Sequence, residues 1–84
     1  MNEKLELFYS RACPYCIKVL HAIKEMGLED SIELRNIYTD ESARQTLISV
    51  GGKQQVPCLF IDGAPLYESS DIVAWLGERV ASSQ

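Results

Sequence analysis

Hydrophobic positions recur with two spacings along the chain, every second residue in some segments and every third or fourth in others. Leu5–Tyr9 is rich in apolar, β-prone residues and predicts a short first strand. Pro14 suits the first turn of a helix, and Gly27 suits its end. At about 100° of rotation per residue, one face of this helix carries Cys16, Val19, Leu20, Ile23 and Met26. We therefore expect an amphipathic helix with this face turned inward.

A second strand and a second helix are predicted in the middle of the chain. Ser31–Arg35 alternates between apolar and polar residues, as a strand with one buried face does. Asp40 is suited to cap a helix over residues 41–50, and the pair Gly51-Gly52 is suited to end it. The order strand, helix, strand predicts two parallel strands joined by a right-handed crossover.

The last third of the chain predicts a hairpin and a final helix. Cys58–Ile61 and Ala64–Tyr67 flank an Asp62-Gly63 pair, which is a strong hairpin signal between two apolar runs. A helix that starts near Ser69 or Ser70 carries on one side Ile72, Val73, Leu76 and Val80. The complete order, β-α-β-α-β-β-α, predicts an α/β fold with a four-stranded mixed sheet and three helices.

Length and charge narrow the class of protein. With 84 residues, of which 46% are hydrophobic, the chain is expected to form one domain over residues 1–84. Its formal charge of −4 makes nucleic acid an unlikely partner, since phosphate-backbone binding needs clustered Lys and Arg. The longest apolar run, Val56–Ile61, is far shorter than a membrane span or a signal-peptide core. We expect a cytoplasmic protein, where structural disulfides are rare.

The segment Cys13-Pro14-Tyr15-Cys16 carries the chemistry that the sequence predicts. It lies between a strand and a helix, so Cys13 falls at the helix N-cap, where unpaired N–H groups and the helix dipole stabilise a thiolate. Arg11 adds positive charge nearby. Cys16 lies one turn further on, on the inward face, where burial keeps a thiol protonated. The spacing predicts that Cys13 attacks disulfides and that Cys16 then resolves the mixed disulfide.

A zinc site is the alternative for these cysteines. Zinc normally takes four Cys or His ligands, and the remaining candidates in the chain are His21 and Cys58. His21 projects about 140° away from Cys16 on a helical wheel, so we expect no metal. His21 itself is interpreted as a solvated residue. Cys58 is interpreted as a small core residue, and the alternative is a third reactive thiol near the site.

The sequence resembles the glutaredoxins over essentially its whole length. Three motifs carry the resemblance in the family's order: Y-S-R-A-C-P-Y-C after the first strand, Q-V-P before the third, and E-S-S-D-I-V at the last helix. The resemblance implies a thioredoxin-like fold and glutathione as the reducing co-substrate. It also implies that the substrates are glutathione mixed disulfides and protein disulfides, and we expect the protein to act as a monomer.

The resemblance also implies roles for individual residues. Cys13 is the attacking thiol, Cys16 the resolving one, and Pro57 a cis-proline beside them. The backbone of Val56 pairs with the cysteinyl part of glutathione, and Tyr15 forms a wall of the groove. Arg11 and Gln55 lie where the family contacts the glycine carboxylate, although Arg11 is two residues before Cys13 and the family's basic residue is commonly three before.

The start of the last helix departs from the common glutaredoxin pattern. Glu68-Ser69-Ser70-Asp71 stands where many members have G-G-x-D, and its E-S pair resembles the glutathione-binding motif of glutathione transferase N-terminal domains. The helix N-terminus with Ser69 and Ser70 is suited to hold the γ-glutamyl carboxylate, and Asp71 or Glu68 to meet its ammonium. The alternative is that these residues only cap the helix.

Two other functions stay open at this point. Some glutaredoxins carry an iron–sulfur cluster held by glutathione and by Cys13-type thiolates of two chains, although Pro14 beside the cysteine disfavours this in the family. A non-catalytic glutathione-binding module derived from a transferase is the other. The intact pair of cysteines favours an enzyme.

Overall fold

The computed structural model, which describes residues 3–82, contains one mixed sheet. Its strands are β1 (Leu5–Tyr9), β2 (Ile32–Asn36), β3 (Cys58–Ile61) and β4 (Ala64–Tyr67), in the spatial order β2-β1-β3-β4. β1 is parallel to β2 and antiparallel to β3, and β3 and β4 form an antiparallel hairpin. The hairpin turn has positive φ at both Asp62 (50°) and Gly63 (88°), as a tight two-residue turn requires. The predicted α/β fold with a four-stranded mixed sheet is confirmed.

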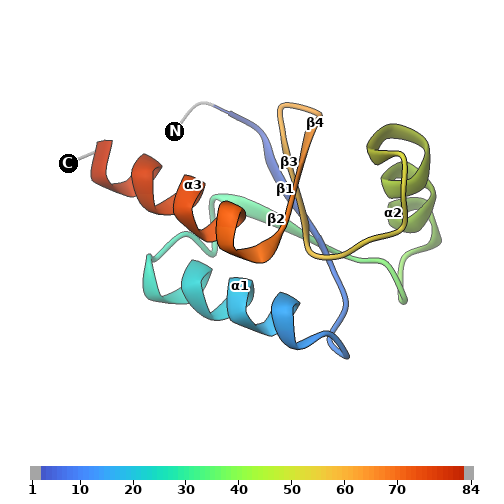
Figure 1. Cartoon of the computed structure of the whole chain (residues 1–84), viewed down its shortest axis with the longest axis horizontal. Helices are drawn as coiled ribbons and strands as arrows, with labels where there is room; N and C mark the ends of the chain where they lie inside the picture. Colours follow the sequence, from blue (N-terminus) through green and yellow to red (C-terminus); the bar gives the residue numbers. More distant parts are fainter. Residues whose placement is uncertain (1–2, 83–84) are drawn as a thin grey trace.

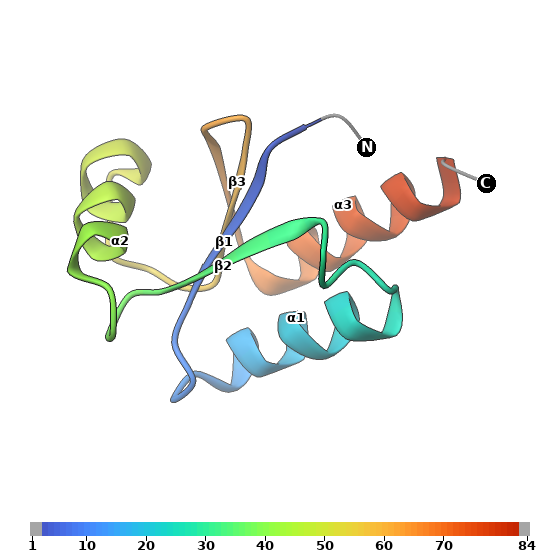
Figure 2. The same cartoon turned by 180° about the vertical axis from the view of Figure 1, so that it is seen from behind.

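Three helices cover the sheet in two layers (Figure 1). α1 (Pro14–Glu25) and α3 (Ser69–Ser82) lie side by side, and α2 (Glu41–Thr46) packs separately, beyond the other face. The view from behind shows that α1 and α3 run in the same direction, so that both begin on the side of the molecule where α2 lies (Figure 2). Within residues 3–82, no helix is long and apolar enough to cross a membrane.

The second helical segment differs from its prediction in one respect. Asp40 caps it as expected, because its side chain accepts hydrogen bonds from the N–H groups of Ser42 and Ala43. After Thr46, however, the α-helix gives way to a π-helical turn over Leu47–Gly51. In this turn the Ser49 hydroxyl donates to the Gln45 carbonyl at 2.8 Å, a side-chain bond of the kind that competes with the backbone bonds and bends a helix.

The two faces of the sheet are buried in two separate clusters. The larger cluster joins the sheet to α1 and α3, and the smaller one joins it to α2. In β3, Leu59 belongs to the larger cluster, whereas Cys58 and Phe60 belong to the smaller one, where the Phe60 ring packs 4.5 Å from that of Phe8. Because successive residues of a strand point to opposite faces, Cys58 lies across the sheet from Cys16.

Candidate functional site

Cys13 lies where the first strand passes into the first helix. After buried β1 the chain turns tightly, and the Cys13 N–H donates to the Ser10 carbonyl at 3.4 Å. Cys13 then has an extended backbone and is the N-cap of α1, with Pro14 as the first helical residue. Its side chain makes no capping hydrogen bond and is partly buried. The sulfur is therefore held at the N-terminus of α1 without being used to cap it.

Cys16 is in a very different environment, one helical turn away. Its side chain is fully buried in the larger core cluster, and it accepts a hydrogen bond from the Ser10 N–H at 3.5 Å. Burial raises the pKa of the Cys16 thiol from 9.0 to about 12, and the adjacent Cys13 thiol adds to this rise. Both cysteines are free thiols in this structure. At neutral pH Cys16 is thus a protonated thiol, while Cys13 is the one that solvent and ligands reach.

The segment before β3 passes directly beside Cys13. The Val56–Pro57 peptide bond is cis, as the resemblance implies. The Cys13 sulfur lies 3.9 Å from the Val56 carbonyl oxygen, within the reach of a weak thiol hydrogen bond. Residues 43 positions apart in the sequence therefore meet at the candidate nucleophile.

A polar groove of about 540 Å³ opens next to this contact. Three segments form its walls: the first turns of α1, the segment before β3, and the junction of β4 with α3. The residues that line it are Tyr15, Lys18, Gln55, Val56, Pro57, Glu68, Ser69 and Ser70. The groove therefore has backbone, hydroxyl, amide and charged groups available beside a thiol, which is the mixture that binds a small polar ligand in one orientation.

Hydrogen bonds join two of these walls. The Gln55 side-chain amide donates to the Glu68 carboxylate at 3.0 Å, and the Tyr67 hydroxyl donates to the Lys53 carbonyl at 3.1 Å. The Lys53 ammonium also lies 4.6 Å from the centre of the Tyr67 ring. Glu68 has a positive φ of 75°, an uncommon conformation for this residue type, at the point where β4 turns into α3. These contacts fix the segment before β3 against the start of α3.

The sequence predicted most of the groove and missed one residue. Seven of the lining residues are among the predicted glutathione contacts, and the eighth, Lys18, is not. Lys18 is three residues after Tyr15, so the two share a side of α1, and this spacing was the available signal. Arg11 and Asp71 are exposed but do not line the groove. Their predicted ligand contacts stay predictions.

The third cysteine is removed from this site. Cys58 is fully buried in the smaller core cluster, on the opposite face of the sheet. Burial raises the pKa of its thiol from 9.0 to about 11, although a hydrogen bond with the Tyr67 side chain acts in the opposite direction. Among the two interpretations of Cys58, the geometry favours the core residue.

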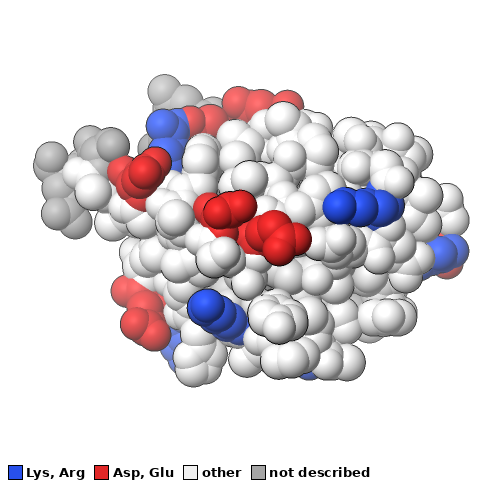
Figure 3. Space-filling view, viewed as in Figure 1, with Lys and Arg blue, Asp and Glu red and all other residues white. Residues whose placement is uncertain are grey.

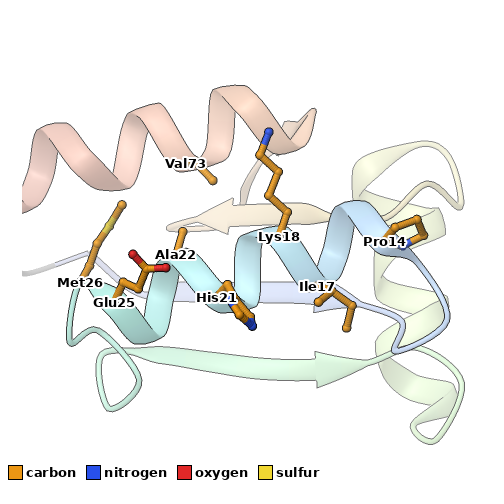
Figure 4. A pocket seen from close by; sticks show the side chains of 8 residues that line it. All are labelled: Pro14, Ile17, Lys18, His21, Ala22, Glu25, Met26 and Val73. Atoms are coloured by element: carbon orange, nitrogen blue, oxygen red, sulfur yellow. The ribbon is translucent and has the colours of Figure 1, made fainter.

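A second hollow, of about 720 Å³, runs along α1 and is bordered by Val73 of α3 (Figure 4). Its other lining residues are Pro14, Ile17, Lys18, His21, Ala22, Glu25 and Met26. His21 is exposed there, as predicted. Within residues 3–82, no three His, Cys, Asp or Glu side chains are grouped so as to hold a metal ion.

Comparison with a solved structure defines the class of the fold. The chain superposes on the crystal structure of a thioredoxin-like protein with a TM-score of 0.75 and 23% sequence identity, over 89% of this chain and 97% of that one. The shared arrangement is a mixed sheet with helices on both faces. The chain therefore has a thioredoxin-like fold, with two cysteines at the start of the first helix.

Sequence comparisons then give the family. Residues 12–79 match the model of the glutathione S-transferase N-terminal domain. A probable glutaredoxin from Synechocystis is 29% identical over 88% of this chain and 83% of its own length. Glutaredoxin 1 from Rickettsia conorii is 38% identical over 61% of this chain and 50% of its own length. The chain therefore belongs to the family of glutathione S-transferase N-terminal domains, and the curated proteins that it resembles are glutaredoxins.

Proposed function

We propose that this protein is a glutathione-dependent thiol–disulfide oxidoreductase, which reduces glutathione mixed disulfides and protein disulfides through Cys13 and Cys16. The unequal burial of the two thiols carries this proposal. Cys13 is partly accessible at the N-terminus of α1, whereas Cys16 is fully buried, and burial raises the pKa of its thiol to about 12. One sulfur is therefore suited to attack, and the other becomes reactive only after a disulfide forms beside it.

The reaction with a glutathione mixed disulfide, R–S–S–G, needs only the first thiol. The Cys13 thiolate attacks the glutathione sulfur, a Cys13–glutathione disulfide forms, and the S–S bond between R–S and glutathione breaks. R–S⁻ leaves and takes up a proton from water. A second glutathione thiolate then attacks the Cys13-bound glutathione sulfur, which releases oxidised glutathione and restores the Cys13 thiolate. The sum is R–S–S–G + GSH → R–SH + GSSG.

With a protein disulfide, Cys16 takes part. Cys13 attacks one sulfur of the substrate and forms a mixed disulfide with it. Cys16 gives up its proton and attacks the Cys13 sulfur, so that a Cys13–Cys16 disulfide forms and the reduced substrate leaves. Two glutathione molecules then reduce this disulfide and become GSSG. Glutathione acts as co-substrate, and the partners of the protein are glutathione and proteins that carry disulfides or glutathionylated cysteines.

The polar groove is the proposed binding site for glutathione. The Val56 backbone pairs with its cysteinyl part beside the Cys13 sulfur, and the first turn of α3 with Ser69 and Ser70 receives its γ-glutamyl carboxylate. Gln55 and Glu68 supply an amide and a carboxylate at the same wall. Tyr15 closes the side of the groove next to the cysteines.

A coupled assay tests the proposal. A glutathionylated peptide is supplied with glutathione, glutathione reductase and NADPH, and NADPH oxidation is followed. We expect turnover by the native protein, none by Cys13→Ser, and native turnover by Cys58→Ala, the matched change in a thiol outside the site. Turnover by Cys13→Ser at the native rate would overturn the proposal. Glutathione binding without turnover by the native protein would favour a non-catalytic binding module instead.

A further inference from the structure

Lys18 borders both of the hollows described above. It is the one residue that lines both the polar groove and the apolar hollow along α1. In Figure 4 its side chain rises from α1, and its ammonium end points toward the first turn of α3. Ser69 and Ser70, which begin that turn, line the same groove. Lys18 thus faces the candidate carboxylate-binding end of the groove from across it.

The ammonium of Lys18 is not committed to another group. Within residues 3–82, it has no hydrogen bond, ion pair or aromatic partner, whereas the ammonium of Lys53 lies against the Tyr67 ring. Lys18 is also the single cation among the eight residues that line the groove, and Arg11 lies outside it. The groove therefore contains one free positive charge, at a defined place.

The charges around the groove show why the Lys18 ammonium would affect the binding of a ligand carboxylate. Glu68 lines the wall opposite α1, and Asp71 lies in the first turn of α3. Acidic side chains lie close together over this part of the surface, and basic ones are scattered (Figure 3). The whole chain carries a net charge of −4. Without Lys18, a ligand carboxylate in the groove would meet the Glu68 carboxylate, with only the N–H groups of the helix to offset the repulsion.

We propose that Lys18 is a specificity-determining residue of the groove: its ammonium pairs with a ligand carboxylate at the first turn of α3, while Glu68 faces the ligand's ammonium group. The inference rests on the proposed function and defines the substrate class more closely. The preferred ligand half is a zwitterionic thiol that bears an α-carboxylate, as the γ-glutamyl end of glutathione does. A neutral thiol of similar size is a poor substitute.

Binding measurements on four proteins test the role of Lys18. The proteins are the native chain, Lys18→Ala, Lys18→Arg and the control Lys24→Ala, which removes the same charge from an exposed position of α1 outside both hollows. The probes are S-methylglutathione, which cannot exchange disulfides, and its dimethyl ester, in which both carboxylates are blocked. Dissociation constants come from NMR titration, and KM and kcat from the coupled assay with a glutathionylated peptide.

We expect Lys18→Ala to weaken S-methylglutathione binding about tenfold, the range for loss of one charge-assisted hydrogen bond. The ester should bind all four proteins within about twofold of one another, because it has no carboxylate for Lys18 to pair with. Lys18→Arg should bind S-methylglutathione nearly as the native chain does. In turnover, Lys18→Ala should raise KM and leave kcat within about twofold.

Two results would overturn the role of Lys18 while leaving the proposed function intact. In the first, the native protein binds S-methylglutathione and reduces the mixed disulfide, and Lys18→Ala binds S-methylglutathione as tightly as Lys24→Ala does. The other is an equal loss of affinity for S-methylglutathione and for its ester, which would show that the alkyl part of Lys18 only packs against the ligand. A native protein that neither binds S-methylglutathione nor reduces the mixed disulfide would instead overturn the proposed function.

Discussion

The Cys13 sulfur lies 3.9 Å from the carbonyl oxygen of Val56, although the two residues are 43 positions apart in the sequence. Cys13 is brought there as the N-cap of α1, and Val56 by the cis peptide bond that links it to Pro57. The contact joins the helix that carries both site thiols to the wall of the polar groove. A ligand sulfur bound beside Val56 is thereby next to the candidate nucleophile.

The burial of the thiols predicts selective alkylation. Cys16 and Cys58 are fully buried, and burial raises the pKa values of their thiols to about 12 and 11. Since the thiolate is the reactive form, iodoacetamide at pH 8 should modify Cys13 alone in the folded, reduced protein. Mass spectrometry should find one adduct on the native chain and three in denaturant. A native chain with two or three adducts would contradict the burial assigned to Cys16 and Cys58.

A second prediction concerns the cap of α2 and its dependence on pH. The Ser42 hydroxyl, which donates to the Asp40 carboxylate at 2.9 Å, and then the Ala43 N–H hold the pKa of Asp40 below its usual 3.8. A carboxyl whose pKa is lower in the folded state stabilises that state above the unfolded pKa, and the effect is lost as the pH falls through the folded one. Asp40→Asn should therefore lower Tm at pH 7, and the difference from the native chain should shrink below about pH 4.

The matched control for this cap is Asp30→Asn, in the exposed loop between α1 and β2. It removes the same charge at a position that caps no helix, whereas Asp40→Asn removes the charge on the cap. Thermal unfolding followed by circular dichroism from pH 2 to 7 compares the two variants. A Tm difference for Asp40→Asn that stays constant over this range would show that charge on the cap does not stabilise the helix.

A third prediction concerns packing at two glycines, Gly51 beside Tyr67 and Gly77 within α3. A Cβ at Gly51 would overlap the Tyr67 hydroxyl, which donates to the Lys53 carbonyl and helps fix the wall of the groove. Gly51→Ala should therefore destabilise the fold by about 1–3 kcal/mol, the usual cost of overpacking. Gly77 lies within α3, where a Cβ would meet only the Met26 methyl carbon at 3.9 Å.

Gly77→Ala is the opposite case and serves as the control for the same chemical change. With room for the methyl group, the higher helix propensity of alanine should raise stability by about 0.5–1 kcal/mol. Urea unfolding of both variants measures the difference. Equal effects of the two substitutions would show that the contact between Tyr67 and Gly51 does not constrain the fold.

The sequence predicted features that depend on neighbouring residues and missed those that depend on distant ones. Pro14, Asp40 and Gly63 act within a few residues of themselves, and the elements that they begin or end lie close to the predicted positions, except that the helix after Asp40 stays α-helical only as far as Thr46. The hydrogen bond between Gln55 and Glu68 joins residues 13 positions apart, and only the folded sheet brings them together.

Lys18 illustrates the same limit at the site itself. On a helical wheel Lys18 falls on the side opposite the buried residues, and it is exposed in the structure. A helical wheel does not show where α3 lies, and the first turn of α3 forms the wall of the groove that faces Lys18. The resemblance to glutaredoxins supplied the other lining residues because its motifs mark all three walls, but these motifs do not include position 18.

The last prediction tests the division of labour between Cys13 and Cys16. Cys16→Ser should still reduce glutathione mixed disulfides, because a second glutathione can release Cys13. It should lose most of its reduction of protein disulfides, since the trapped complex must wait for external thiol. A thiol one helical turn away acts at an effective concentration that free glutathione, on the order of millimolar in cells, does not reach.

The two assays must therefore diverge in this one variant. If Cys16→Ser loses mixed-disulfide reduction as completely as Cys13→Ser does, Cys16 acts in the attacking step or is needed for the fold. Its full burial in the core makes the second cause testable, because a hydroxyl there replaces a sulfur that accepts the Ser10 N–H. A thermal melt separates the two: a native Tm with no turnover assigns Cys16 to the attack, and a lowered Tm assigns it to the core.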